Sequence, residues 1–236
     1  PKPQNPASLN YLNMNFIITF ACCLLLVLGK KNPELDLEYK NNFYILLSSS
    51  KFYFNYRHSS NVLIFYKYLK ERGITDDRIL LMLPENHACN ARNPMKGQIY
   101  MKTDHSENFY CNEIEIDYKS DDLTYEAILN LFRGRYDPNF PESKKLKTNS
   151  ESKLFIYFNG HGGENFFKIQ DTEVLQSEDF AKVYEEMSMK KMYKEVLMFI
   201  DTCQAMTLFD GVDSPDLILM GTSVLGQSAY SHQHDH

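Results

Sequence analysis

A short apolar run that stops at a cysteine limits the possible folds of this chain more than any other stretch. Residues 196–200 read Val-Leu-Met-Phe-Ile, which is long enough for a buried strand and too short for a typical helix. The run ends abruptly in the polar sequence Asp-Thr-Cys-Gln at residues 201–204. The sequence therefore predicts a rigid strand that carries one thiol, that of Cys203, to its carboxyl end and presents it in a loop.

A second apolar run of the same kind ends at a histidine. Residues 154–158 read Leu-Phe-Ile-Tyr-Phe and are followed at residues 159–163 by Asn-Gly-His-Gly-Gly. If the two strands are parallel neighbours, their carboxyl ends place Cys203 beside His161, at the edge where open α/β sheets bind ligands. An imidazole beside a thiol can activate it as a nucleophile, so we predict a Cys–His pair at this edge.

The other segments alternate between strands and helices. Val62, Phe65, Tyr66 and Leu69 follow the i, i+3, i+4 and i+7 spacing of one helix face. Residues 113–118 alternate between polar and apolar, which predicts a half-exposed hairpin strand. The first half of the chain is expected to form a strand at 43–47, a loop at 51–58, the helix just described, a strand at 78–83 and the hairpin strand. The second half is expected to form a helix at 123–132, the histidine strand, a polar hairpin at 168–171, a helix at 177–190, the cysteine strand and a strand at 217–220. Gly73 and Gly134 are expected to end the first two helices, and Ser177 to cap the third. This order predicts a three-layer α/β/α sandwich with a mostly parallel sheet.

The size and composition of the chain fit one globular domain. The chain has 236 residues, of which 43% are hydrophobic, so it can build a substantial core and is too apolar for a disordered protein. The net charge of -6 at pH 7 gives no reason to expect nucleic acid as a partner.

The start of the chain contains an apolar run at residues 16–28. Its length matches the core of a secretory signal peptide and falls short of the about 20 residues that span a bilayer. We therefore expect a signal peptide at residues 14–29, with a non-cleaved anchor as the alternative. Residues 1–13 are expected to be upstream or fragment sequence. Residues 30–236 are expected to form the folded domain, which is C-terminally truncated because no closing element precedes the end of the chain.

The cysteines outside the apolar run are odd in number. They are Cys89, Cys111 and Cys203, and an odd count in a secretory compartment indicates a free reactive thiol, an intermolecular disulfide, or both. Cys203 is the candidate for the reactive thiol. Cys89 lies in a polar, Asn-rich loop and is expected to be either a disulfide bridge to a partner chain or a plain loop thiol.

Four short motifs, taken in order, resemble those of the legumain-like cysteine peptidase family. They read Phe-Asn-Tyr-Arg-His at 54–58, Asn-Gly-His-Gly-Gly at 159–163, Lys-Ile-Gln-Asp at 168–171 and Asp-Thr-Cys-Gln at 201–204. The resemblance runs from about residue 42 to residue 235 and implies that residues 30–236 form a caspase-like catalytic domain. Within the family, the motifs look most like those of the branch that attaches GPI anchors to proteins.

The resemblance also implies roles for the residues at the edge of the sheet. Cys203 would be the nucleophile and His161 the general base and then the acid. Gly162 can bring its backbone N–H close to the substrate and would form an oxyanion hole together with the N–H of Cys203. Asn55 matches the family position beside the histidine, where an amide oxygen holds the tautomer of the ring.

Five further positions match the substrate pocket of the family. They are Arg57, His58, Asp201, Ser223 and Asp235. Legumain itself has a glutamate at the position of Asp201. The aspartate therefore argues against strict asparaginyl specificity and fits the GPI branch, which accepts several small residues at the cleaved bond.

The chemistry requires no cofactor, and a second group of residues is a candidate calcium site. Glu115 and Asp117 are two residues apart on a predicted strand and therefore point to the same face. Together with Asp76 and the carbonyl of Ile79, they match positions in the family where hard oxygen ligands hold Ca²⁺. The alternative is a solvated acidic face.

The function implied by the resemblance is transamidation on the lumenal side of the endoplasmic reticulum membrane. The implied substrates are the C-terminal signal of a proprotein and a GPI lipid, and the implied partners are the other subunits of a transamidase complex. Two alternatives stay open: a legumain-like asparaginyl endopeptidase that cleaves without partners, and a non-catalytic scaffold subunit. The presence of Cys203, His161 and Asn55 together argues against the scaffold.

Overall fold

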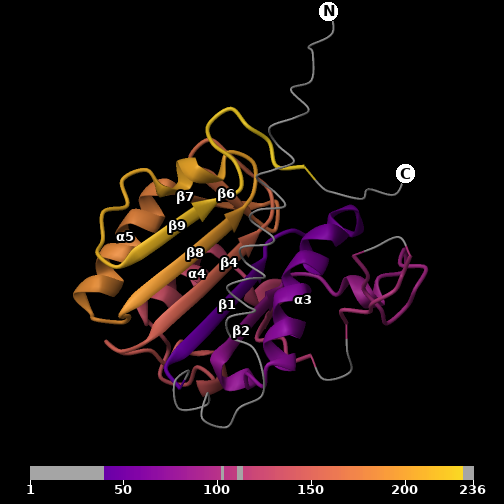
Figure 1. Ribbon diagram of the computed structural model, residues 1–236, viewed down its shortest axis with the longest axis horizontal. Coiled ribbons are helices and arrows are strands. Elements are labelled where there is room, and N and C mark those ends of the chain that lie inside the picture. The colour runs from indigo at the N-terminus through magenta and orange to yellow at the C-terminus, as the bar shows by residue number, and fades with distance from the viewer. Residues whose placement is uncertain (1–39, 102–103, 111–113, 231–236) are drawn as a thin grey trace, which may run out of the picture. The chain divides into compact units, whose positions relative to one another are not determined.

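The computed structural model describes residues 40–101, 104–110 and 114–230 (Figure 1). The predictions for residues 1–13 and 14–29, and for Asp235, lie outside this part of the chain. In the described part, no helix is long and apolar enough to cross a membrane.

Six parallel strands form the central sheet of the described chain, in the spatial order β3-β2-β1-β4-β8-β9. Figure 1 labels β2, β1, β4, β8 and β9 in this order. Their bounds are β1 Asn42–Ser48, β2 Ile79–Leu83, β3 Tyr118–Lys119, β4 Lys153–Asn159, β8 Glu195–Asp201 and β9 Leu217–Gly221. The histidine strand β4 and the cysteine strand β8 are direct parallel neighbours, as the sequence predicts.

Helices cover both faces of this sheet. They are α3 Tyr56–Glu71, α4 Tyr125–Arg133 and α5 Ser177–Met189. Phe158 on β4 packs against Phe132 of α4 and Phe180 of α5, with ring centroids 6.0 and 6.3 Å apart. The preceding residue, Tyr157, packs against Phe65 of α3 at 4.4 Å. Because successive strand residues point to opposite faces, α3 lies on one face and α4 and α5 lie on the other. This confirms the three-layer sandwich.

A small antiparallel sheet follows the histidine strand. It consists of β5 Gly162–Gly163, β6 Phe166–Ile169 and β7 Glu173–Gln176. The chain reverses between β6 and β7 through Gln170 and Asp171, which have φ values of 52° and 63°. The hairpin predicted at 168–171 is therefore confirmed, and it extends the loop that carries the histidine.

Short 3-10 helices complete the described part of the chain. They are η1 Tyr53–Asn55, η2 Asp76–Arg78, η3 His87–Cys89, η4 Ser120–Asp122, η5 Glu142–Lys144 and η6 Ala205–Phe209. Two of them lie near the carboxyl ends of strands that neighbour the histidine strand: η1 follows β1, and η6 follows β8.

Three local predictions were wrong. The loop expected at 51–58 ends early, because η1 leads directly into α3, so Arg57 and His58 are helical. Residue 113 of the hairpin strand expected at 113–118 lies outside the described part of the chain, and of residues 114–118 only Tyr118 belongs to a strand, β3, which pairs in parallel with β2. Asp117 explains this, since its carboxylate accepts the N–H of Leu81 at 2.9 Å and so takes a donor from the strand ladder.

The third error concerns the start of α5. The N-cap is Gln176 and not Ser177. The backbone N–H of Gln176 donates to the Asp179 carboxylate at 2.8 Å, and the side chain of Gln176 accepts a backbone N–H in return. This reciprocal capping box satisfies two amide donors that a single serine hydroxyl would not. The predicted end of α4 is confirmed, because Gly134 has the left-handed conformation with φ 61°.

Candidate active site

The register of β4 and β8 delivers two reactive side chains to one edge of the sheet. Asn159, the last residue of β4, is the register partner of Asp201, the last residue of β8. His161 and Cys203 each stand two residues beyond these partners. Both therefore leave the sheet at its carboxyl edge, on adjacent strands.

Two glycines allow the histidine loop to lie tightly against its neighbours. A Cβ on Gly160 would stand 2.0 Å from the hydroxyl oxygen of Ser49, and one on Gly162 would stand 2.7 Å from Oγ1 of Thr202. Both distances are far below a van der Waals contact. Gly162 directly follows His161, and Thr202 directly precedes Cys203. Their close approach therefore brings the two loops into contact.

Asn55 decides which nitrogen of His161 carries the proton. The Nδ2 group of Asn55 donates to the Lys51 carbonyl at 2.6 Å, so the amide oxygen is turned toward the ring. That oxygen lies 2.8 Å from Nε2 of His161. An amide oxygen accepts and cannot donate, so Nε2 carries the proton and Nδ1 of the neutral ring keeps a lone pair. This is the tautomer that a base needs.

The environment of His161 favours the neutral imidazole. Burial lowers the pKa of His161, the charges of Arg57 and Lys168 lower it further, and the Asp171 carboxylate opposes them. The ring of His58 packs edge-on against that of His161, with centroids 4.9 Å apart. His161 is therefore held as a base at neutral pH and not as an imidazolium.

Cys203 is partly exposed beside a guanidinium group. Its thiol donates to the carbonyl of Ala229 at 4.0 Å. Within the described residues, the sulfur forms this hydrogen bond and none with His161. Burial lowers the pKa of Arg57, and the Asp201 carboxylate and Cys203 both oppose this shift. The guanidinium group of Arg57 thus interacts with both Asp201 and Cys203.

Asp201 forms the acidic side of the same edge. Its Oδ2 accepts from Nδ2 of Asn159 at 2.6 Å and from the hydroxyl of Tyr157 at 3.1 Å. Burial raises the pKa of Asp201, while these hydrogen bonds and the charge of Arg57 lower it. Arg57 therefore interacts electrostatically with Asp201 as well as with Cys203.

Two predicted pocket residues are buried. Ser223 donates its hydroxyl to the Thr202 carbonyl at 2.7 Å and accepts the N–H of Ala205 at 3.1 Å, so it braces the backbone on both sides of Cys203. His58 is 5% exposed, and Nδ1 of its ring lies 2.8 Å from the hydroxyl of Ser50. Burial lowers the pKa of His58 to about 2, so the ring is uncharged.

Sequence comparison relates the chain to a known family. The model of the peptidase C13 family matches residues 42–235.

The chain belongs to the peptidase C13 family.

Relatives within this family are GPI-anchor transamidases. That of Schizosaccharomyces pombe is 42% identical over 219 residues, which cover 93% of this chain and 57% of the relative. That of Saccharomyces cerevisiae is 42% identical over 195 residues, or 83% of this chain and 47% of the relative. The human protein is 38% identical over 195 residues, or 83% and 49%. The chain spans about half the length of these curated relatives.

The four residues predicted as calcium ligands are only partly brought together in this C13 domain. Burial raises the pKa of Asp117 to about 7, and the charges of Glu115 and Asp76 add to this rise. Asp76 accepts a hydrogen bond from Tyr66 at 2.8 Å and forms an ion pair with Lys70. In the described chain, no three His, Cys, Asp or Glu side chains form a metal-binding group. Calcium therefore stays a prediction.

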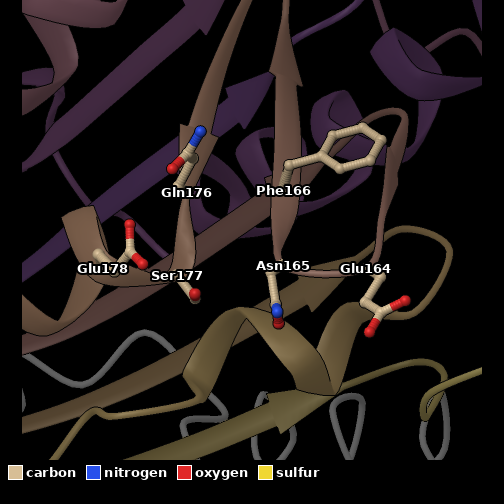
Figure 2. Close-up of a pocket in the computed structure, with 6 residues that line it drawn as sticks. All are labelled: Glu164, Asn165, Phe166, Gln176, Ser177 and Glu178. Atoms are coloured by element: carbon tan, nitrogen blue, oxygen red, sulfur yellow. The ribbon is translucent and has the colours of Figure 1, made fainter.

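A pocket of about 240 Å³ lies beside the small sheet of the C13 domain (Figure 2). It is lined by Glu164, Asn165, Phe166, Gln176, Ser177 and Glu178. The carbonyl of Asn165 accepts the N–H of Ser177 at 3.0 Å across it. None of the predicted site residues lines this pocket, so the candidate active site is the edge of the sheet and not the pocket.

Sequence reasoning missed the buried polar residues behind the site. Ser48, Ser49 and Ser50 are exposed by 2% or less, and Ser50 holds the ring of His58. His87 was not singled out either, although it is fully buried. Three consecutive serines directly after an apolar strand were the available signal, because a polar run at the active edge of a sheet indicates a hydrogen-bonded support.

Proposed function

We propose that this chain carries the catalytic domain of a GPI-anchor transamidase. The observation that carries the proposal is the identity of 38–42% with GPI-anchor transamidases over 83–93% of the chain. The delivery of Cys203 and His161 to one edge, with Asn55 bonded to the ring, supports it. The proposed reaction takes place on the lumenal side of the endoplasmic reticulum membrane, in a complex with the other transamidase subunits.

The first half of the proposed reaction forms a thioester. Nδ1 of His161 takes the proton of Cys203, and the thiolate attacks the carbonyl carbon at the attachment site of the proprotein. The carbonyl oxygen becomes an oxyanion, which the N–H groups of Gly162 and Cys203 stabilise. His161 then gives its proton to the leaving nitrogen. The C–N bond breaks, and the C-terminal signal departs as an amine.

The second half transfers the acyl group to the lipid. The amine of the GPI ethanolamine phosphate attacks the thioester carbon while His161 accepts one of its protons. The tetrahedral intermediate collapses, the C–S bond breaks, and Cys203 leaves as a thiolate that His161 reprotonates. The products are an amide between protein and lipid and the enzyme in its starting state. No metal or redox step is needed for this balance.

We propose that the substrate binds across the charged residues beside the nucleophile. Arg57 and Asp201 would contact polar groups near the cleaved bond, since both lie next to Cys203. His58 and Ser223 would shape the pocket from behind, because both are buried. Asp235, which lies outside the described residues, completes the set that the family resemblance implies.

The test is display of a GPI-anchored reporter on cells that depend on this chain for anchoring. Cys203→Ala and His161→Ala should each abolish display, because no other described group can replace the thiolate or its base. Met189→Ala is the control, since Met189 is 69% exposed on the far end of α5. Normal display with Cys203→Ala would refute the proposal. Cleavage of Asn-containing peptides by the isolated chain at acid pH would favour the endopeptidase instead.

We also propose that the acidic residues near β2 bind calcium. Asp76, Glu115, Asp117 and the Ile79 carbonyl offer the oxygen ligands that Ca²⁺ prefers, and the charges of Glu115 and Asp76 act on Asp117. Bound calcium would tie β2 to the segment that precedes β3, without a role in the chemistry. Calcium should raise the melting temperature of the wild type and leave that of Asp117→Ala unchanged. Equal shifts in both would favour a solvated acidic face.

We further propose that Cys89 forms a disulfide with a partner subunit. Its side chain is exposed and its sulfur is free in this chain, so it is accessible to a second protein. Nonreducing electrophoresis of the assembled complex should show a heavier band that Cys89→Ser removes. A band that persists in this variant would leave Cys89 as a plain loop thiol.

A further inference from the structure

Phe52 has a backbone conformation that L-residues rarely adopt. Its φ is 69° and its ψ is 145°, a combination of positive φ and extended ψ that is populated almost only by glycine. A residue with a Cβ persists there when its surroundings hold it in place. Phe52 lies directly before η1, the short helix that ends in Asn55.

Both polar groups of Phe52 are held by one neighbouring loop. Its N–H donates to Oε2 of Glu85 at 2.5 Å. Its carbonyl accepts from Nε2 of His87 at 3.0 Å. Glu85 and His87 both follow β2, 33 and 35 residues further along the chain. The loop after β2 therefore fixes the loop after β1 at its strained residue.

The two holding side chains are themselves fixed. His87 is fully buried, and its Nδ1 lies 2.8 Å from the hydroxyl of Ser59 on α3. Because the Phe52 carbonyl can only accept, Nε2 of His87 carries a proton and donates the hydrogen bond to that carbonyl. Oε1 of Glu85 accepts from Nδ2 of Asn90 at 2.5 Å.

The strained residue in turn sets the position of Asn55. The Phe52 carbonyl also accepts the backbone N–H of Asn55 at 2.9 Å. The carbonyl of Lys51, one peptide earlier, accepts the Nδ2 group of Asn55 at 2.6 Å. The direction of both carbonyls depends on the torsion angles at Phe52. Asn55 then presents its oxygen to Nε2 of His161 at 2.8 Å.

We propose that Glu85 and His87 are positioning residues for the catalytic histidine. They hold Phe52 in its strained conformation, Phe52 orients the amide of Asn55, and Asn55 fixes the tautomer and the direction of the His161 ring. Neither Glu85 nor His87 contacts the reacting atoms. This inference rests on the proposed function, since it assigns these residues to the same acyl transfer.

The test uses the assembled transamidase and measures release of the C-terminal signal from a proprotein. The concentration of active enzyme is measured by titrating the Cys203 thiol with an electrophilic peptide, and each rate is divided by it. A variant that yields less folded enzyme therefore does not show a lower kcat for that reason. Glu85→Ala should lower kcat about tenfold or more, because a small misplacement of a catalytic group is costly, and leave KM nearly unchanged. Glu85→Gln should keep most of the wild-type kcat, because its amide oxygen can still accept the N–H of Phe52 and only the bond from Asn90 to the second oxygen is lost.

Glu107→Ala is the matched control. Glu107 pairs with Lys67 at 2.6 Å, away from Phe52, so the same chemical change there should leave kcat unchanged. The decisive variant is Phe52→Gly combined with Glu85→Ala. Glycine adopts the strained torsion angles without support, so this double variant should recover most of the lost kcat. A residue with a purely structural role would not be rescued by a more flexible neighbour.

Two results would overturn the inference: an unchanged kcat in Glu85→Ala, or a loss that Phe52→Gly does not restore. Phe52→Gly alone provides a second check, since it should fold and keep its activity. Activity that survives Cys203→Ala would instead refute the proposed function. Activity that depends on Cys203 but not on Glu85 would refute the positioning role alone.

Discussion

The candidate active site is assembled from two pairs of loops that are built in different ways. The loops after β4 and β8 carry the reactive groups, and they approach each other closely because Gly160 and Gly162 have no side chains. The loops after β1 and β2 carry no reactive group, and buried hydrogen bonds around His58 and His87 hold them. The position of the first pair depends on close packing, and the position of the second pair depends on hydrogen bonds. The two pairs should therefore fail in different ways when they are mutated.

The largest effect is expected where the two pairs meet, at the hydrogen bond between Asn55 and His161. Asn55→Ala removes the acceptor for Nε2–H, so the ring loses its fixed tautomer and orientation. We expect the transamidation rate to fall about 10²-fold, the lower end of what a positioned general base contributes. Asn139→Ala, at an exposed turn, is the control. A rate within a factor of about two of the wild type would mean that the loops after β1 and β2, the support loops, do not act through this bond.

The next largest effect is expected from adding a methyl group in the loop after β4, which packs tightly against its neighbours. Gly160→Ala and Gly162→Ala should each destabilise the protein by about 1–3 kcal/mol, the usual cost of overpacking. Ser49→Gly should restore most of the stability lost in Gly160→Ala, because the Ser49 side chain supplies two of the three nearest atoms and the third, Cζ of Phe167, stands 3.2 Å from the new Cβ. Thr202→Ala should not restore Gly162→Ala, because the Phe166 carbonyl also stands 2.8 Å from the new Cβ. Urea unfolding measures all four, and equal rescue of both would contradict the packing described.

His58 is a buried histidine of α3 that bonds to Ser50 in the loop after β1, and it should affect the pH dependence of stability. The pKa of His58 is about 2 in the folded protein and about 6.5 when unfolded, so the unfolded chain binds the extra proton between these values. Stability present above pH 6.5 is therefore lost as the pH falls, by up to about 1.4 kcal/mol per pH unit. His58→Gln should reduce this slope between pH 4 and 6. An unchanged slope would mean that His58 is charged when folded.

The smallest effect concerns the charges that face His161. Lys168 lowers the pKa of His161 and Asp171 raises it, beside the larger effects of burial and Arg57. Lys168→Gln should therefore raise this pKa, and the acid limb of the kcat/KM profile should move to higher pH because catalysis needs the neutral ring. Asp171→Asn should move the limb to lower pH. Shifts in the same direction for both variants would contradict the assignment of the limb to His161.

Much of the fold was predictable because its signals are local. The apolar runs ending at Cys203 and His161 predicted two strands, and the small polar residues after each run predicted where the strands stop. The start of α3 was missed because Asn55 and Arg57 look like loop residues until η1 joins them to the helix. The parallel β3 was missed because the pairing of Asp117 with Leu81 connects residues 36 positions apart.

The sequence by itself determined the two reactive side chains, Cys203 and His161, and the strands that carry them. It could do so because strand, turn and helix signals depend on neighbouring residues. It could not determine which nitrogen of His161 is free. That was decided by Asn55, which lies 106 residues away and is aimed by its bond to the Lys51 carbonyl. A hydrogen bond between residues so far apart exists only after the sheet has formed, so the protonation state of the base is a property of the tertiary structure.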